Sequence, residues 1–310
     1  MLKEDLISLT TEQINEQSRN IDKQSTYDIL KIMNNEDHKV AQAVQNCLQP
    51  ISEAVDQIHH SIRHGGRLIY VGAGTSGRLG ILDAAECPPT FGTPHEMVQA
   101  IMAGGSKAIL QAVEGAEDSS EHGRLDLIEK ELQAGDTVVG ITASGRTPYV
   151  VGALQYAKEV GAATVGIACN SNSRVGQVAD IAIEVEVGPE VIMGSTRLKA
   201  ATAQKMVLNM LSTATMVKLG KVYQNLMIDL APTNVKLIDR ARRIVANVTN
   251  SSYEKAQQVL DLADQEVKTA IVMIEGDATA NEARRSIEEA GGMVRAAIGH
   301  VLKVKEGDAG

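Results

Sequence analysis

The chain has 310 residues, a formal net charge of −9, one Phe and no Trp, and 44% of its residues are apolar. The ordinary apolar fraction excludes a disordered chain, and the acidic, aromatic-poor composition argues against a nucleic-acid partner. Three scattered cysteines form no disulfide framework, and no segment reads as a signal peptide or a membrane span. These features predict a soluble cytoplasmic protein with no membrane partner.

The first 64 residues read as an N-terminal helical arm that packs on the following domain. Residues 1–25 are polar and predict an extended or loosely helical segment. In residues 25–64 apolar side chains recur at spacings of three and four, which predicts helix with Ser25 as the N-cap. Pro50 should start or kink the second half of this run.

From residue 65 the pattern changes to short apolar strands that alternate with helices. Such strands are typical of a parallel sheet that is buried on both faces. The predicted fold is therefore α/β, with a doubly wound five-stranded parallel sheet in residues 65–230. The expected strands are 67–71, 97–103, 137–142, 164–168 and 181–186. Helices are expected at 76–86, 106–114, 119–133, 148–160, 174–179 and 197–220, the first of them ending at the Cys87-Pro88-Pro89 segment.

Residues 231–310 predict a small C-terminal helical domain. Its expected helices are 233–248, 252–264, 278–290 and 293–304, whereas 267–274 is compatible with either strand or helix. The sequence leaves the purpose of this domain open between a bundle that packs on the sheet domain, a lid and a dimerisation element.

Three segments rich in Gly, Ser and Thr lie where ligands bind in open α/β sheets. We call 72–78 (GAGTSGR) the first loop, 142–148 (TASGRTP) the second loop and 194–199 (GSTRLK) the third loop. Each combines small residues, hydroxyls and a helix N-terminus, which together can hold a phosphate, and Arg78, Arg146 or Arg197 could add positive charge. One such loop alone is as readily a capped strand-to-helix turn. Three together favour a phosphorylated small molecule as the ligand.

Acidic residues lie close to these loops in the sequence. Asp83 and Glu86 are three residues apart on the helix after the first loop, and Glu117 belongs to a second acidic cluster, 113–118. Taken alone, each acid is by default a solvated surface carboxylate or a cap, but two acids beside a phosphosugar would suit general acid–base catalysis. The histidines form no cluster with the cysteines, so no metal site is expected.

The segment 72–90 (GAGTSGRLGILDAAECPPT) resembles the signature of the N-acetylmuramic acid 6-phosphate etherases. The resemblance continues through 112–118, 143–149, 194–200, 204–213 and 220–229 and covers most of the chain. It implies the sugar isomerase (SIS) fold, which binds phosphosugars. It also implies a lyase that converts N-acetylmuramic acid 6-phosphate to N-acetylglucosamine 6-phosphate and D-lactate in cell-wall amino-sugar recycling, without metal or organic cofactor.

The same resemblance assigns roles to individual residues. It places the two catalytic glutamates at Glu86, as the proton donor, and at Glu117, which we take as the base that removes the C2 proton. The phosphosugar-binding positions are carried over more loosely. They are Gly74, Thr75, Ser76, Ser144, Gly145, Thr147, Ser195 and Thr196. Which loop holds the phosphate stays open.

The expected helix 76–86 has a consequence for the assembly. At ~1.5 Å per residue, Glu86 would lie about 15 Å along the axis from the first loop, too far for both to serve one small sugar. We therefore expect a homodimer in which Glu86 completes the site of the partner subunit. Two other functions stay open at this point: a non-catalytic phosphosugar regulator like the glucokinase regulatory protein, and a phosphosugar isomerase.

Overall fold

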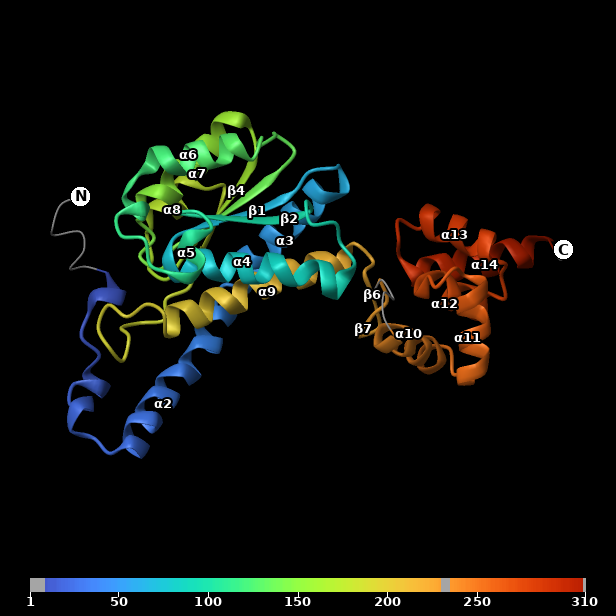
Figure 1. The fold of residues 1–310 in the computed structure, drawn as a ribbon, viewed down its shortest axis with the longest axis horizontal. Coiled ribbons are helices and arrows are strands. Elements are labelled where there is room, and N and C mark those ends of the chain that lie inside the picture. Colours follow the sequence, from blue (N-terminus) through green and yellow to red (C-terminus); the bar gives the residue numbers. More distant parts are fainter. Residues whose placement is uncertain (1–8, 230–234, 309–310) are drawn as a thin grey trace. The chain divides into compact units, whose positions relative to one another are not determined.

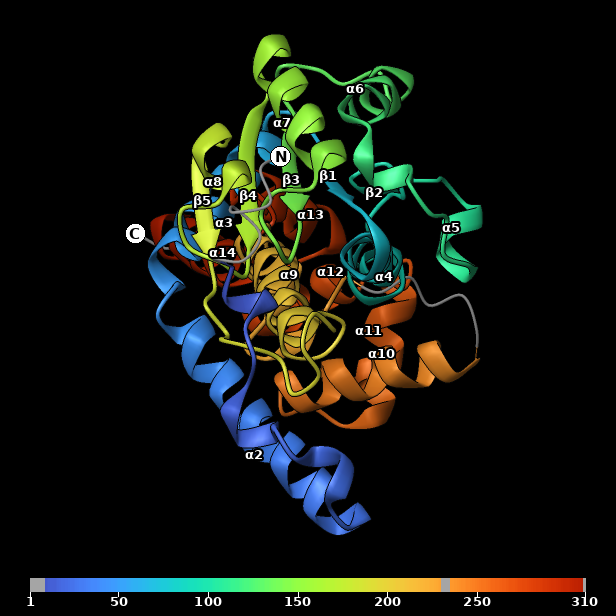
Figure 2. The same ribbon diagram turned by 90° about the vertical axis from the view of Figure 1, so that its left-hand side faces the viewer.

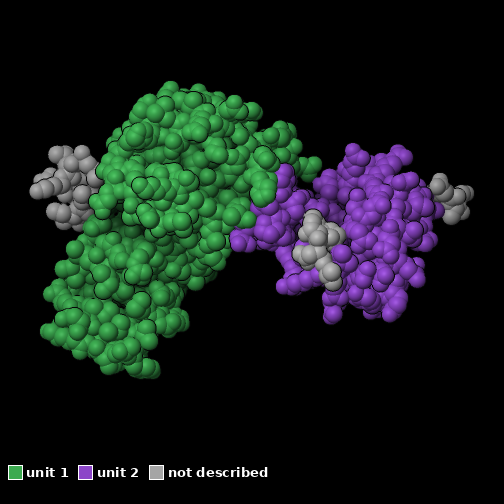
Figure 3. Space-filling model, viewed as in Figure 1, with its two compact units in different colours: residues 1–85, 95–212 green, residues 86–94, 213–310 purple. Residues whose placement is uncertain are grey.

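The computed structural model describes residues 9–229 and 235–308. Contacts within the chain divide it into two compact units, drawn in different colours in Figure 3. Unit 1 comprises residues 1–85 and 95–212, and unit 2 comprises residues 86–94 and 213–310. Two long helices, α4 (Gly74–Phe91) and α9 (Lys199–Lys218), each begin in unit 1 and end in unit 2.

Unit 1 is built on a five-stranded parallel sheet in the order β2-β1-β3-β4-β5. Its strands are β1 (Leu68–Gly72), β2 (Val98–Met102), β3 (Thr137–Ile141), β4 (Ala163–Ala168) and β5 (Ile181–Glu184). Every residue of β1 and of β3 is buried, as expected for apolar strands covered on both faces. The predicted α/β fold with a doubly wound five-stranded sheet is confirmed. Gly72 lies level with Met102 and Ile141 on the neighbouring strands, so three carboxyl ends meet at one edge.

Helices cover both faces of this sheet (Figures 1 and 2). One face carries α7 (Pro148–Val160) and α8 (Arg174–Val178), and α6 (Ser120–Glu129) packs against α7. The other face carries α3 (Leu48–Arg63) and the first turns of α4, where Gly80 approaches Tyr70 of β1 so closely that a Cβ would lie 3.0 Å from the Tyr70 Cβ. The short α5 (Lys107–Leu110) ends well before its predicted limit, because the chain is already extended at Gln111.

The predicted end of the helix after the first loop is wrong. Instead of stopping at Cys87-Pro88-Pro89, α4 includes Pro88 and Pro89 and runs to Phe91. The fixed φ of proline suits a helix, although Pro88 and Pro89 each lack the N–H that would bond to the carbonyl four residues earlier. The last turn is still closed, because the Gly92 N–H bonds to the Pro88 carbonyl at 2.9 Å. The helix ends at Gly92, whose φ is +61° and whose Cβ would collide with the Asp229 carbonyl oxygen at 2.1 Å.

The N-terminal arm consists of short 3₁₀ turns followed by α2 (Thr26–Gln45) and α3. The turns are η1 (Thr10–Glu12), η2 (Glu16–Ser18) and η3 (Ile21–Lys23), and the part of the predicted arm before residue 9 lies outside the described residues. Ser25 caps α2 as predicted, since its hydroxyl accepts the Asp28 N–H at 3.2 Å. Pro50 lies in the first turn of α3, which confirms that it starts a second helix.

Unit 2 is mainly helical, as predicted for the C-terminal region. It contains α10 (Val235–Val248), α11 (Tyr253–Leu262), α12 (Val267–Gly276), α13 (Ala280–Glu289) and α14 (Val294–Asp308). The predicted start of α10 at residue 233 lies outside the described residues. The ambiguous segment 267–274 is helical, and its run of consecutive buried residues reflects a helix surrounded by core. A small hairpin, β6 (Val222–Tyr223) with β7 (Leu226–Met227), was not predicted. Within residues 9–229 and 235–308 no helix is both long and apolar enough to cross a bilayer.

Candidate active site

A cavity of about 280 Å³ opens beside the carboxyl ends of β1 and β2. The first loop lines it through Ala73, Gly74 and Arg78, and the end of β2 contributes Met102 and Ala103. Segment 112–117, which follows β2 and α5, forms the remaining wall. The structure therefore brings Gly74 and Glu117, two of the predicted site residues, into the same cavity.

The first loop leads from β1 straight into α4. Gly74 is its turning point, with φ +53° and no atom within 4 Å of the point where a Cβ would lie. In the described residues no partner is bonded to the N–H groups of Gly74, Thr75 and Ser76, so the positive end of α4 is open. Thr75 is half-buried. The buried Ser76 hydroxyl donates to Gln204 Oε1 at 2.9 Å, which ties the loop to α9.

The second loop is held by its own hydroxyls. The Thr147 and Thr142 hydroxyls are 2.7 Å apart, and the Ser144 hydroxyl accepts the Arg146 N–H at 3.2 Å. Gly145 has φ +74°, and a Cβ there would lie 2.4 Å from Ser173 Cβ. All three predicted residues of this loop, Ser144, Gly145 and Thr147, thus shape its backbone at the carboxyl end of β3.

The third loop differs from the prediction in one respect. Ser195 and Thr196 are half-buried in the turn before α9, but the N-terminus of that helix is already occupied by a protein carboxylate. The fully buried Glu190 accepts the N–H groups of Lys199 and Ala200 at 3.0 and 2.9 Å. Burial raises the pKa of Glu190, and these two hydrogen bonds and the Lys199 charge offset only part of that rise. The N-terminus of α9, which the sequence predicted as a candidate phosphate site, is therefore already capped by Glu190.

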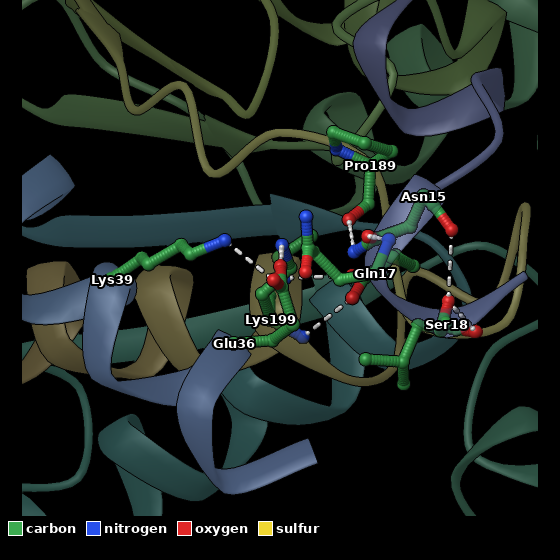
Figure 4. A network of polar contacts seen from close by, with 10 residues as sticks. Asn15, Gln17, Ser18, Glu36, Lys39, Pro189 and Lys199 are labelled. Carbon is green, nitrogen blue, oxygen red and sulfur yellow. Dashed lines mark hydrogen bonds and ion pairs between the residues drawn. The ribbon is translucent and has the colours of Figure 1, made fainter. Parts of the chain in front are cut away.

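The N-terminal arm and α2 are tied to the third loop (Figure 4). Lys199 Nζ lies 2.7 Å from Glu36 Oε2 on α2, and both side chains are almost fully buried. Lys39 reaches the other Glu36 oxygen at 2.5 Å. Burial alone would raise the pKa of Glu36, but the hydrogen bonds from Lys199 and Lys39 outweigh it and lower the pKa. Sequence patterns gave no signal for Glu36, because its buried partner Lys199 lies 163 residues further along the chain. Glu190 was missed because it reaches the start of α9 across an irregular loop that has no periodicity.

Asp83 and Glu86 have different surroundings on α4. Asp83 is buried; its carboxylate accepts from the Tyr70 hydroxyl at 2.9 Å, from Asn209 Nδ2 at 2.7 Å and from the Ser212 hydroxyl at 3.1 Å. Burial raises the pKa of Asp83 despite these donors. The alternative of a solvated surface carboxylate is therefore wrong for Asp83. Glu86 is exposed, in the part of α4 that belongs to unit 2.

Glu117 lies in a single 3₁₀ turn, η4 (Ala116–Asp118), between α5 and α6. Gly115 precedes it with φ +73°, a conformation that lets the chain reverse beside the first loop. The Glu117 side chain is exposed. In the described parts of the chain no three His, Cys, Asp or Glu side chains are grouped to hold a metal ion.

Comparisons with known proteins identify the class of this fold. The family model of the glucokinase regulatory protein N-terminal SIS domain matches residues 50–158, and that of the SIS domain matches residues 109–214. A phosphoheptose isomerase from Francisella tularensis superposes with a TM-score of 0.51, covering 63% of this chain and 100% of its own. At 16% identity this likeness shows the fold alone. The sheet and its loops thus define a SIS-domain protein.

The relatives by sequence are far more similar. An N-acetylmuramic acid 6-phosphate etherase of Mycolicibacterium smegmatis is 56% identical over 295 residues, 95% of this chain and 99% of its own. That of Bacillus subtilis is 55% identical over 292 residues, 94% of this chain and 96% of its own. The chain belongs to the N-acetylmuramic acid 6-phosphate etherase family.

Proposed function

We propose that the protein is a carbon–oxygen lyase that cleaves the D-lactyl ether of N-acetylmuramic acid 6-phosphate. The products are N-acetylglucosamine 6-phosphate and D-lactate, which suits a role in the recycling of cell-wall amino sugars. Family membership supports this activity. The observation that carries it in the structure is the cavity shared by the first loop and Glu117, because it puts a carboxylate beside a turn suited to a phosphosugar.

The proposed chemistry is an elimination followed by an addition. In the open-chain sugar the C2 proton is acidic because C2 is next to the C1 aldehyde. A base removes this proton, the C3–O bond breaks, and an acid protonates the departing lactate oxygen. Water then adds across the C2–C3 double bond of the resulting enal: its oxygen bonds to C3 and forms the hydroxyl, and C2 regains a proton. The reaction needs two proton-transfer groups and no redox partner, so we propose that it proceeds without a cofactor.

We assign the C2 base to Glu117 and the proton donor to Glu86. Glu117 sits on a short turn that lines the cavity next to Gly74, within the same unit. For the phosphate, the open N-terminus of α4 in the first loop (Gly74, Thr75, Ser76) and the second loop (Ser144, Gly145, Thr147) are the candidates. The capped terminus of α9 leaves Ser195 and Thr196 to contact the sugar through their hydroxyls.

Glu86 underlies the proposal of a homodimer. Because α4 is continuous from Ser76 to Glu86, the separation of about 15 Å along its axis persists. We propose that Glu86 completes the site of the partner subunit. Mixing Glu86→Ala chains with Glu117→Ala chains should then restore part of the activity through mixed dimers. A lack of recovery after mass spectrometry has verified subunit exchange would contradict this arrangement.

A cytoplasmic location is part of the proposal. Cys47, Cys87 and Cys169 are all buried and none is in a disulfide, which suits a reducing compartment. Fractionation of cells that produce the protein should recover it with cytosolic markers.

The activity itself is tested with N-acetylmuramic acid 6-phosphate in ¹⁸O-labelled water. Elimination and addition put the label in the C3 hydroxyl of N-acetylglucosamine 6-phosphate, which mass spectrometry detects. Label in lactate would mean that the other C–O bond of the ether breaks. Binding without turnover would favour a phosphosugar regulator instead.

A further inference from the structure

Arg146 is the central residue of the second loop, at the carboxyl end of β3. Strand β3 is a direct neighbour of β1, and Ile141 of β3 lies level with Gly72 of β1. The first and second loops therefore leave the sheet side by side, both within unit 1. Arg146 belongs to the same sheet edge as the cavity that contains Glu117.

The backbone around Arg146 is fixed on both sides. Its own N–H donates to the Ser144 hydroxyl at 3.2 Å, and the Gly145 carbonyl accepts the Val175 N–H at 3.0 Å. On the other side the Thr147 hydroxyl bonds to Thr142. The arginine is thus presented by a rigid turn, which lowers the entropic cost of using it in binding.

The guanidinium of Arg146 has no partner among residues 9–229 and 235–308. The residue is half-buried, and its Nε is shielded from solvent without a hydrogen-bond acceptor. Buried N–H groups in proteins normally have a hydrogen-bond acceptor. The Nε–H of Arg146 has none in the described residues, which is unusual for a charged side chain. A ligand oxygen that binds there would supply the missing acceptor.

Two other cations near this edge are already engaged. Arg78 lines the cavity, but its Nε and Nη2 donate to the carbonyls of Ile109 and Ala108 at 2.9 and 2.8 Å. Lys199 is committed to Glu36. The cavity wall also carries Glu114 and Glu117, whose carboxylates repel anions when ionised. An anionic group of a ligand is therefore repelled less on the β3 side of the edge, where Arg146 lies.

We propose that Arg146 binds an oxyanion of the substrate through its guanidinium fork and so contributes to substrate specificity. The inference rests on the proposed function, which supplies a substrate with two such groups, the phosphate and the lactyl carboxylate. Both match the planar fork of arginine, which can form two parallel N–H···O bonds. The Arg146 guanidinium can bind the phosphate and the carboxylate in the same way. Binding experiments with a ligand that lacks the lactyl carboxylate show which of the two it holds.

The test measures binding by calorimetry in the full-length Glu117→Gln background, so that the substrate stays intact. Arg146→Met should weaken the binding of N-acetylmuramic acid 6-phosphate by about 10- to 100-fold, the effect of losing a charge-assisted pair. Arg146→Lys keeps the charge but loses the fork, so its loss should be smaller. Arg174→Met is the matched control, because Arg174 is an exposed arginine at the start of the nearby α8.

Binding of N-acetylglucosamine 6-phosphate tells the two oxyanions apart. This sugar keeps the phosphate but lacks the lactyl group. If Arg146 holds the phosphate, Arg146→Met weakens both ligands alike. If it holds the carboxylate, only N-acetylmuramic acid 6-phosphate is affected. The proposal is overturned if Arg146→Met and Arg146→Lys, with unchanged melting temperatures, bind both ligands as tightly as the Arg174→Met control.

Failure of the inference differs from failure of the proposed function. In the first case the wild-type protein still releases D-lactate and all variants bind alike. In the second case the wild-type protein releases no D-lactate, whatever the arginine variants bind.

Discussion

The first and third loops have similar residues but different surroundings. Both contain a glycine followed by hydroxyl side chains and an arginine, and each opens a helix of 18 or 20 residues. In the first loop the N–H groups at the start of α4 have no bonded partner in the described structure. In the third loop Glu190 accepts the corresponding N–H groups of α9. Whether a helix terminus can take a ligand therefore depends on a residue that lies outside the loop itself.

The largest effect is expected at the acid beside the first loop. Glu117→Gln keeps the size of the side chain but removes the proton acceptor, so kcat should fall by about 10²- to 10⁴-fold with a smaller change in KM. A coupled assay for released D-lactate measures it. Asp118→Asn, in the same 3₁₀ turn, is the control. Equal losses in the two variants would mean that the charge of the turn matters rather than Glu117.

The cap of the third loop should matter for stability. Glu190→Ala leaves two helix N–H groups buried without an acceptor, so the free energy of unfolding should fall by about 1–3 kcal/mol. Urea unfolding followed by circular dichroism measures the change, with the exposed Glu186→Ala as the control. A variant as stable as this control would show that the cap contributes little.

Two glycine substitutions compare the loops directly. Gly74 and Gly194 have φ of +53° and +74°, and a Cβ would meet nothing closer than 3.4 Å at either position. Alanine should therefore cost a similar backbone strain, about 1–2 kcal/mol, in both. Gly74→Ala, next to the cavity, should also raise KM, and by more than Gly194→Ala, because only the first loop offers an open helix terminus. A matching rise in KM for Gly194→Ala would place substrate at both helix termini.

The smallest expected effect is on the pH dependence of the free energy of unfolding. The pKa of Glu190 is raised on folding, so the folded state holds its proton more tightly than the unfolded state. This group therefore favours folding at low pH, and its contribution falls as the pH rises above about 4. Glu190→Gln should show a shallower decline of unfolding free energy in that range. Parallel curves for the variant and the wild-type protein would contradict the assignment.

Local sequence patterns were sufficient for most of the fold. The five strands follow from short apolar runs, and Ser25 and Pro50 marked helix starts because capping and proline geometry are local effects. The end of α4 was mispredicted because the close approach of Gly92 to Asp229, which fixes it, joins residues far apart in the sequence. The hairpin of β6 and β7 was missed because two-residue strands leave no periodicity.

The candidate site was predictable only in part. The Gly, Ser and Thr content of the loops and the resemblance around Glu86 and Glu117 pointed to the residues. The role of the Ser76 hydroxyl was not predictable, because it is bonded to Gln204 on a helix 128 residues further along the chain. The same holds for Asp83, whose donors Asn209 and Ser212 come from α9.

The attachment of the N-terminal arm has a consequence for folding during synthesis. Thr10 bonds to Asn170, Asn15 to the Pro189 carbonyl and Ser18 to the Val191 carbonyl, across 160 to 174 residues of sequence. At roughly 5–20 residues per second, a ribosome needs about 9–35 s to synthesise the later partners. During that time the arm cannot form its native contacts. We therefore expect a protease to cut near residues 9–19 in stalled nascent chains that end before residue 170, and to spare this segment once residue 191 has emerged.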